Sequence, residues 1–327
     1  MNRAGDVVLV LRALGLGDAL TGVAALRGVR RAWPDHQLVL AGPGSSGAWL
    51  RQLGVVDAVL PAAGLAPLGG DGPGGHVAVN LHGRGPQSHR LLRATRPSRL
   101  VGFAAGSIHP DGPDWRAEEH EVDRWCRLVS AAGGWCDRQD LRLHRSVEAP
   151  VGRADVALHP GAAAASRRWP FQRWTQVASW LSRSGHQVTL TGSAAERPLC
   201  EAIVSAAVTA GAPPIRTTAG TLDVPSLAAV VAGARLGVSG DTGVAHLATA
   251  LAAPSVVLFG PPPPRWWGPA IDPELHTVLW HCDQHPVGDP HGSRLDPSLA
   301  DITAAETIGA IESQLARTAT AARSQAG

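Results

Sequence analysis

The 327-residue chain is about twice as long as a usual single domain, so we expect two domains of roughly 150 residues each. Hydrophobic residues make up 44% of it and charged residues 17%, and no apolar run approaches the ~18 residues of a membrane span, which excludes a membrane-embedded or a disordered chain. The net charge of only +2 argues against partners that attract through broad electrostatics, such as nucleic acid or an anionic bilayer.

Two residue types narrow the chemistry and the compartment. The chain has no lysine, so no lysine Schiff base can form and there is no P-loop lysine. The four cysteines have no CxxC spacing, and we expect them to be reduced thiols in a cytoplasmic protein. They are Cys126, Cys136, Cys200 and Cys282.

In the first 150 residues, short β-branched runs alternate with helical patterns. The run Val7–Leu11 predicts a first strand and not a signal peptide, because Arg12 and Asp18 interrupt it and no cleavage site follows. One helix is predicted from about Asp18 to Trp33, where Pro34 stops it. Further strands are predicted at residues 37–40, 58–60, 77–80 and 100–103, and a further helix at residues 119–132.

After a polar stretch at residues 136–154, the same alternation begins again. Strands are predicted at residues 156–158, 188–190, 215, 236–238 and 256–259, and helices at residues 171–184, 194–208, 224–232, 242–251 and 302–317. This order predicts two doubly wound, parallel-sheet α/β domains, one over residues 1–150 and one over residues 151–300, before a last helix in residues 301–327. Open α/β sheets bind ligands outside the carboxyl ends of their strands, so a cleft between the domains is the expected site.

The first strand leads into Gly15-Leu16-Gly17-Asp18 at the start of the first helix. A dinucleotide-binding fingerprint would need a third glycine, where the chain has Leu20, and an acidic residue after the second strand, where it has Ala41. A nicotinamide cofactor is therefore not indicated. Asp18 is either an N-cap of the helix or a carboxylate at the mouth of the site, available as a general base.

A second junction between a strand and a helix lies at Asp241-Thr242-Gly243. Backbone N–H groups and the positive end of the helix dipole make such a start an anion site, and glycine lets a phosphate approach the backbone. His246, about one turn into the helix, projects back toward that end. The alternative is structural, with Asp241 as an N-cap and His246 as a buried histidine whose hydrogen bonds are satisfied.

The longer run from Asp241 to Pro261 reads D-T-G-x-x-H-L-A-x-A-L-x-x-P-x-x-x-L-F-G-P, and it resembles the ADP-heptose:lipopolysaccharide heptosyltransferases of glycosyltransferase family 9. Further matches follow the family's order along nearly the whole chain. They are Leu16-Gly17-Asp18, Asn80-Leu81-His82-Gly83, Gln87-Ser88, Val101-Gly102-Phe103, His120-Glu121-Val122-Asp123-Arg124, His159-Pro160-Gly161, Arg167-Arg168-Trp169-Pro170, Thr191-Gly192 with Glu196, and Ala219-Gly220-Thr221-Leu222.

The resemblance implies a GT-B type fold, in which two Rossmann-like parallel-sheet domains face each other across a cleft. The N-terminal domain would present the acceptor, the C-terminal domain would hold a nucleotide-diphosphate sugar, and the last helix would cross back to the N-terminal domain. The activity implied is an inverting, metal-independent transfer of a heptose-like sugar, from ADP-heptose, to a hydroxyl of a glycan or small-molecule acceptor. No cofactor, nucleic acid or stable membrane insertion is implied.

The resemblance also implies roles for individual residues. Asp18 matches the family's catalytic base, and Arg167 stands where family members commonly carry a lysine against the diphosphate, so we expect it to stabilise the leaving group. The remaining residues implied at the donor site are Gly17, Glu196 near the ribose, Leu222 beside the base, and Asp241, Thr242, Gly243 and His246 at the sugar and pyrophosphate.

Two alternative functions stay open at this stage, while one candidate metal site is set aside. His281, Cys282, His285 and His291 crowd one loop, but their spacing fits no zinc pattern, and we expect no metal there. A sugar-nucleotide epimerase can share the two-domain fold and would consume its substrate without an acceptor. A catalytically silent protein would bind the nucleotide and transfer nothing.

Overall fold

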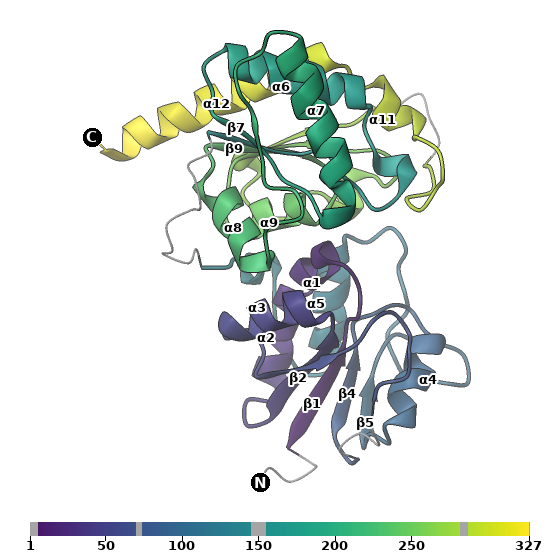
Figure 1. Cartoon of the computed structure of the whole chain (residues 1–327). Helices are drawn as coiled ribbons and strands as arrows, with labels where there is room; N and C mark the ends of the chain where they lie inside the picture. The colour runs from purple at the N-terminus through teal and green to yellow at the C-terminus, as the bar shows by residue number, and fades with distance from the viewer. Residues whose placement is uncertain (1–5, 70–73, 145–154, 282–286, 327) are drawn as a thin grey trace. The chain divides into compact units, whose positions relative to one another are not determined.

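The fold is taken from a computed structural model, which describes residues 6–69, 74–144, 155–281 and 287–326. The chain divides into two compact units, Met1–Leu141 (unit 1) and Arg142–Gly327 (unit 2), and each has its own parallel sheet (Figure 1). The division falls within the polar stretch at residues 136–154. No helix in the described ranges combines the length and the hydrophobicity that crossing a bilayer requires.

Unit 1 is built on a five-stranded parallel sheet in the order β3-β2-β1-β4-β5. The order reverses direction at β1, where β2 lies on one side and β4 on the other, so the loop after β1 occupies the topological switch point. The strands are β1 (Val7–Leu11), β2 (Gln37–Gly42), β3 (Ala58–Pro61), β4 (Val77–Asn80) and β5 (Arg99–Val101).

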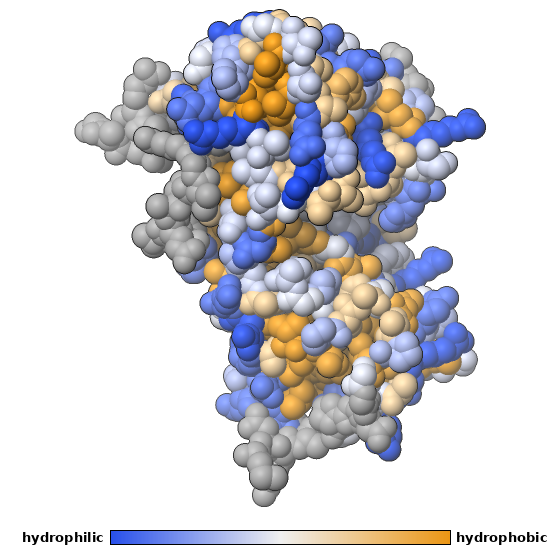
Figure 2. Space-filling view, in the orientation of Figure 1, coloured by the Kyte–Doolittle hydropathy of each residue, from blue (hydrophilic) through white to orange (hydrophobic). Residues whose placement is uncertain are grey.

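Helices cover both faces of this sheet, which explains why β1 is a continuous apolar run. Leu9 and Leu11 pack in one cluster with Leu92 of α4, while Val8 and Val10 point to the opposite face and are equally buried. The helices are α1 (Leu16–Thr21), α2 (Val23–Ala32), α3 (Gly44–Gln52), α4 (Gln87–Ala94) and α5 (Glu121–Ala131). On the side drawn in Figure 2, unit 1 shows a broad hydrophobic area with hydrophilic residues along its margins.

Unit 2 repeats the plan with a six-stranded parallel sheet in the order β11-β10-β9-β6-β7-β8. Its strands are β6 (Val156–His159), β7 (Val188–Leu190), β8 (Arg216–Thr217), β9 (Leu236–Gly240), β10 (Ser255–Leu258) and β11 (His276–Leu279). Here the strand order reverses at β6, between β7 and β9, so the loops that follow these three strands surround the switch point.

The helices of unit 2 are also divided between the two sheet faces. Val156 and Leu158 pack in the main core with α6, α7 and α12, whereas Ala157 points the other way, against Val230 of α8. The helices are α6 (Phe171–Arg183), α7 (Arg197–Thr209), α8 (Val224–Gly233), α9 (Gly243–Ala250), α10 (Pro264–Trp267), α11 (Pro297–Asp301) and α12 (Ala304–Ala326). The return of the last helix to the first domain stays a prediction.

The prediction of a single helix from Asp18 to Trp33 is wrong. The structure has two helices, α1 and α2, which meet at Gly22. A Cβ at Gly22 would lie 2.7 Å from Cδ of Arg12, so the glycine leaves room for that buried side chain. Arg12 donates a hydrogen bond from Nε to the carbonyl of Asp18, which the N–H of Gly22 also contacts. A tertiary contact therefore sets the break.

The sequence did not predict two helices of unit 1, α3 and α4. α3 begins with Gly44-Ser45-Ser46-Gly47, residues of low helix propensity, and α4 carries few apolar residues. α3 forms because packing outweighs propensity: Trp49 and Leu50 are buried, and Gly47 lies so close to Val59 that a Cβ would come within 2.7 Å of it.

Candidate functional site

Asp18 lies in the loop and helix that follow the central strand of unit 1. It occupies the third position of α1, whose N-cap is Gly15, so the N-cap interpretation of Asp18 is wrong. The Asp18 side chain is 29% exposed, which leaves its carboxyl group accessible from one side. Gly17, one residue earlier in α1, is half-buried.

The position of Asp18 is fixed by a fully buried cation, Arg12, at the end of β1. The Arg12 side chain is 0% exposed, and its Nε donates to the backbone carbonyl of Asp18. Its Nη1 donates to the carbonyl of Leu81 after β4, and its Nη2 donates to Thr21 Oγ1 at 2.8 Å. The carboxylate of Asp18 is 3.7 Å from Nη2 of Arg12, a looser ion pair than these hydrogen bonds. One guanidinium thus joins β1, α1 and the loop after β4.

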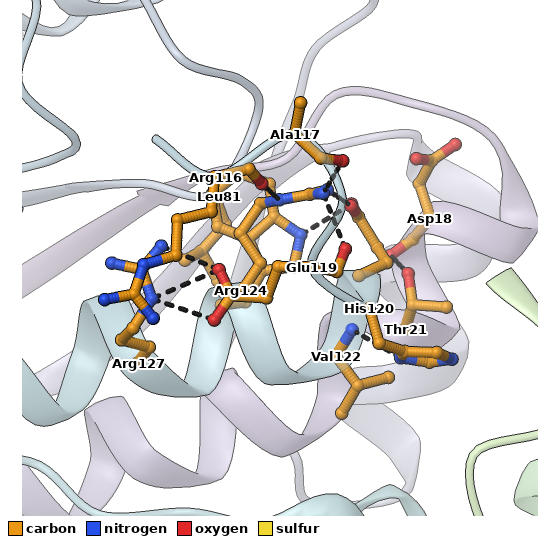
Figure 3. A network of polar contacts seen from close by, with 12 residues as sticks. Asp18, Thr21, Leu81, Arg116, Ala117, Glu119, His120, Val122, Arg124 and Arg127 are labelled. Atoms are coloured by element: carbon orange, nitrogen blue, oxygen red, sulfur yellow. Dashed lines mark hydrogen bonds and ion pairs between the residues drawn. The ribbon is translucent and has the colours of Figure 1, made fainter. Parts of the chain in front are cut away.

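Glu121 compensates the charge of Arg12 and extends the network into α5. Its Oε1 accepts from Arg12 Nη2 at 3.1 Å and from Trp125 Nε1 at 2.6 Å, and its Oε2 accepts from Arg124 Nη1. Arg124 in turn donates to the carbonyls of Arg116, Ala117 and Glu119, as Figure 3 shows. The sequence analysis gave no role to Arg12, Glu121 or Arg124. The sequence did contain one signal for this network, because Arg12 is a charged residue that directly follows a buried strand.

Burial raises the pKa of the Asp18 carboxyl above its ordinary value, since the protein withdraws water from it. The guanidinium of Arg12 lowers this pKa and the carboxylate of Glu121 raises it, so the two neighbours oppose each other. In Figure 3 the carboxyl group of Asp18 points away from the labelled arginines Arg124 and Arg127. A carboxylate with a raised pKa and an open side is suited to accept a proton.

In unit 2, Arg167 and Asp241 lie together at the carboxyl ends of the central strands. Arg167 ends a short 3-10 helix, Ala165–Arg167, and its Nη1 donates to the backbone carbonyl of Asp241 at 3.1 Å. The same nitrogen is 3.8 Å from Oδ2 of the buried Asp241 side chain. Nε of Arg167 is buried and has no hydrogen-bond partner among the described residues. The Arg167 side chain as a whole is 22% exposed, so part of the guanidinium group is accessible to a ligand.

The next residues form the start of α9. Thr242 is the N-cap, so the interpretation of Asp241 as the cap is wrong, and the buried Oγ1 of Thr242 has no hydrogen-bond partner in the described ranges. Gly243 opens the helix, as the sequence predicted. The ring of His246 packs edge-on against Trp267 with centroids 6.1 Å apart. Trp267 itself packs against a hydrophobic cluster that includes Phe259.

Glu196 forms a second group with the loop after β6. Its Oε2 accepts from the backbone N–H of Ser193 at 2.7 Å, in a capping box at the 3-10 helix Ala194–Glu196. A Cβ on Gly161 would come within 2.0 Å of Glu196 Oε1, so only glycine permits this approach. Beside them, His159 Nδ1 is 2.9 Å from Thr191 Oγ1. Burial lowers the pKa of His159, against the smaller opposite effect of Glu196, which favours a neutral imidazole.

Two further expectations concern Leu222 and the histidine-rich loop. Leu222 is half-buried and packs against the hydrophobic cluster of Ala157, Val230 and Ala234. His281 Nε2 pairs with Glu306 at 3.0 Å. The described part of the chain contains no cluster of three or more potential metal ligands, while Cys282 and His285 lie outside the described residues.

Comparison with known proteins identifies the family. Residues 114–287, just over half of the chain, match glycosyltransferase family 9 (heptosyltransferase). The chain belongs to glycosyltransferase family 9. It is 24% identical over 343 residues to lipopolysaccharide heptosyltransferase 2 of Escherichia coli, covering 90% of this chain and 94% of that protein. Membership of this family makes it a glycosyltransferase.

Solved structures of the family share the fold over nearly the whole chain. The ADP-heptose lipopolysaccharide heptosyltransferase II of E. coli superposes with a TM-score of 0.76 at 20% identity, covering 95% of this chain and 99% of that one. The E. coli heptosyltransferase WaaC with ADP superposes with a TM-score of 0.69 at 18% identity, covering 94% and 99%. The predicted GT-B class, with two parallel-sheet α/β domains, is confirmed.

The buried network of this family 9 protein predicts a large difference between two arginines of unit 1. Arg12→Met should lower the free energy of unfolding by about 3–5 kcal/mol. The substitution would leave the buried carboxylate of Glu121 without the cation that Arg12 provides. Arg30→Met is the matched control, since Arg30 pairs with Asp57 through half-exposed side chains, and should cost only about 0–1 kcal/mol. Urea denaturation followed by tryptophan fluorescence measures both. Equal small losses would contradict the structural role of Arg12.

Proposed function

We propose that the protein is an inverting heptosyltransferase that uses ADP-heptose and transfers the sugar to a hydroxyl group of an acceptor. The oxygen of the acceptor attacks the anomeric carbon, the bond from that carbon to the diphosphate breaks, ADP leaves, and the proton of the hydroxyl passes to Asp18. The observation that carries this proposal is the carboxyl of Asp18, which is partly exposed, has a raised pKa, and is held at the switch point of unit 1 by Arg12.

The base assignment follows from both the position and the chemistry of Asp18. A general base works best when its pKa lies near the working pH, and burial moves the pKa of Asp18 in that direction. Arg12 contacts the backbone of Asp18 more closely than its carboxylate, so the cation orients the residue without tightly occupying its oxygens. Gly17, one residue before Asp18 in α1, would contact the donor, as the family resemblance implies.

The donor assignment rests on a partly exposed cation and a helix start in unit 2. Arg167, whose side chain is 22% exposed, and the first N–H groups of α9 after the N-cap Thr242 can donate to a diphosphate, and Gly243 removes a side chain from the approach. The loose pairing of Arg167 with Asp241 leaves the guanidinium available for the charge that develops on the leaving group. Asp241 and His246 would contact the sugar and pyrophosphate, Glu196 the ribose and Leu222 the base. Relatives solved with ADP and with ADP-2-deoxy-2-fluoro heptose support an adenosine-diphosphate donor.

Asp18→Asn should reduce the rate of glycosyl transfer by about 10²–10⁴-fold, because a carboxamide cannot accept the proton. Stability should not fall. A raised folded-state pKa means that the ionised carboxyl destabilises the folded protein above that pKa, and this cost disappears as the pH falls through it. The amide removes the cost at neutral pH, so the melting temperature should be equal to or higher than that of the wild type.

Asp35→Asn, which changes an exposed aspartate of the same unit, is the control and should keep full activity. Transfer by Asp18→Asn within a few-fold of the wild-type rate would rule out the base role. Consumption of ADP-heptose without any acceptor would instead favour the epimerase alternative.

Arg167→Ala should raise the dissociation constant for ADP by roughly tenfold or more, since charge-assisted hydrogen bonds to phosphate are worth about 1.5–3 kcal/mol. Arg235→Ala is a matched control. Arg235 is exposed and lies just before β9, whereas Asp241 lies just after it. The control substitution therefore removes the same charge from the other end of that strand. Isothermal titration calorimetry compares the two variants. Equal dissociation constants would show that Arg167 does not bind the diphosphate.

A further inference from the structure

The two cysteines of unit 1 lie side by side. Cys126 is buried in α5, and Cys136 is half-buried in the segment between α5 and the 3-10 helix Arg138–Leu141. A hydrogen bond joins their side chains, and it raises the pKa of the Cys126 thiol above the ordinary cysteine value. Burial acts in the same direction. Neither residue belongs to the candidate sites at Asp18 and Arg167.

The chain turns back on itself directly after α5, and this turn returns Cys136 to the helix. The N–H of Gly134 donates to the carbonyl of Val129 at 3.1 Å. Gly133 has a φ of +100°, in the left-handed region that favours glycine. Since Cys126 and Val129 are three residues apart, they share one face of α5. The turn therefore directs Cys136 toward the face that carries Cys126.

The sulfur of Cys136 also packs closely against α2. A Cβ on Gly28 of α2 would lie 2.9 Å from Sγ of Cys136 and 2.9 Å from Cγ1 of Val129, so only glycine leaves room for both side chains. One point on α2 is thus in contact with Cys136 and with the face of α5 that Val129 shares with Cys126. This packing holds the Cys136 thiol between the two helices.

Two ion pairs fix the rest of the segment. Arg138 donates from Nε and Nη2 to the two carboxylate oxygens of Asp123 in α5, at 2.8 and 2.5 Å. Arg31 of α2 donates to the two carboxylate oxygens of Asp140 at 2.7 and 2.6 Å. Such bidentate pairs fix direction as well as distance, so the segment is tied to both helices. Two sulfur atoms held in this way need only small side-chain rotations to reach the S–S bond length of about 2 Å.

We propose that Cys126 and Cys136 form a modification site, at which oxidation by a peroxide joins α5 to the segment after it through a reversible disulfide. Cys136 is the more exposed thiol and reacts first: its sulfur takes one oxygen from hydrogen peroxide to become a sulfenic acid, and the peroxide is reduced to water. The sulfur of Cys126 then attacks that sulfur. The S–S bond forms, the S–O bond breaks, and the oxygen leaves as a second water with the proton of Cys126.

The adjacent thiol determines how far the oxidation proceeds. A sulfenic acid that meets no thiol is oxidised further to sulfinic and sulfonic acids, which thiol reductants do not reverse, whereas a dithiol reductant restores both thiols of a disulfide. Cys200 of unit 2 provides the contrast, because it is buried and its Sγ lies 3.6 Å from the backbone carbonyl of Thr191. The site in unit 1 follows from this geometry and does not rest on the proposed function.

Peptide mass spectrometry of the full-length protein tests the site. The protein is treated with hydrogen peroxide, its remaining thiols are blocked, and trypsin cleaves it after Arg124, Arg127 and Arg138. Residues 125–127 should then be found joined to residues 128–138 through a disulfide that accounts for most of the oxidised Cys136. Dithiothreitol should separate the two peptides and restore both thiols. Cys200 should remain a thiol under the same conditions.

Two serine variants separate the pair from the other cysteines. In Cys126→Ser, the sulfenic acid of Cys136 should persist and react with dimedone. Cys200→Ser is the matched control, since it changes another buried cysteine, and should give the same linked peptide as the wild type. The inference would be overturned if the wild type formed no linked peptide, if Cys136 joined mainly to Cys200 or Cys282, or if Cys136 became a sulfinic acid while Cys126 stayed a thiol. Because these outcomes are read from the wild type, they hold even if Cys126→Ser does not fold.

Discussion

The buried guanidinium of Arg12 is the interaction on which the candidate site of unit 1 depends. Removing a charge from water is expensive, and it is tolerated here because every side of the guanidinium meets an acceptor. Those acceptors come from α1, the loop after β4 and α5, so one side chain joins segments that are far apart in the sequence. Glycine at position 22 is the local condition for this arrangement, because any side chain there would displace Arg12.

The same cation determines the chemistry available to Asp18. A direct, tight ion pair would hold the pKa of the carboxyl low and make it a poor base. The closest bonds of Arg12 go instead to backbone carbonyls, Thr21 and Glu121, while burial raises the pKa of Asp18. Unit 2 shows a related solution, since Arg167 pairs only loosely with Asp241 and its side chain is 22% exposed. In each unit, neighbouring residues hold a charged group in place and leave part of it accessible to a ligand. The group is the carboxyl of Asp18 in unit 1 and the guanidinium of Arg167 in unit 2.

The central strands could be predicted from the sequence because they are buried on both faces, whereas the edge strand β11 (His276–Leu279) was not predicted. Val7–Leu11, Val77–Asn80 and Val188–Leu190 have the predicted bounds, since continuous β-branched runs between turn residues leave few alternatives. Asp18 and the run from Asp241 to Gly243 also lie at the strand-to-helix junctions that the sequence predicted. What could not be predicted depends on contacts between distant segments. The break at Gly22 is set by Arg12, and α3 forms through packing of Trp49 and of Gly47 against Val59.

The pH dependence of kcat/KM for transfer, compared between the wild type and Glu121→Gln, tests the central claim most directly. We expect the wild-type rate to fall on the acid side with a single pKa above the ordinary aspartate value of about 3.9. Because the charge of Glu121 raises the pKa of Asp18, its removal should move this acid limb to lower pH. Superimposable acid limbs for the two proteins, or no acid limb above the ordinary aspartate range, would contradict the account.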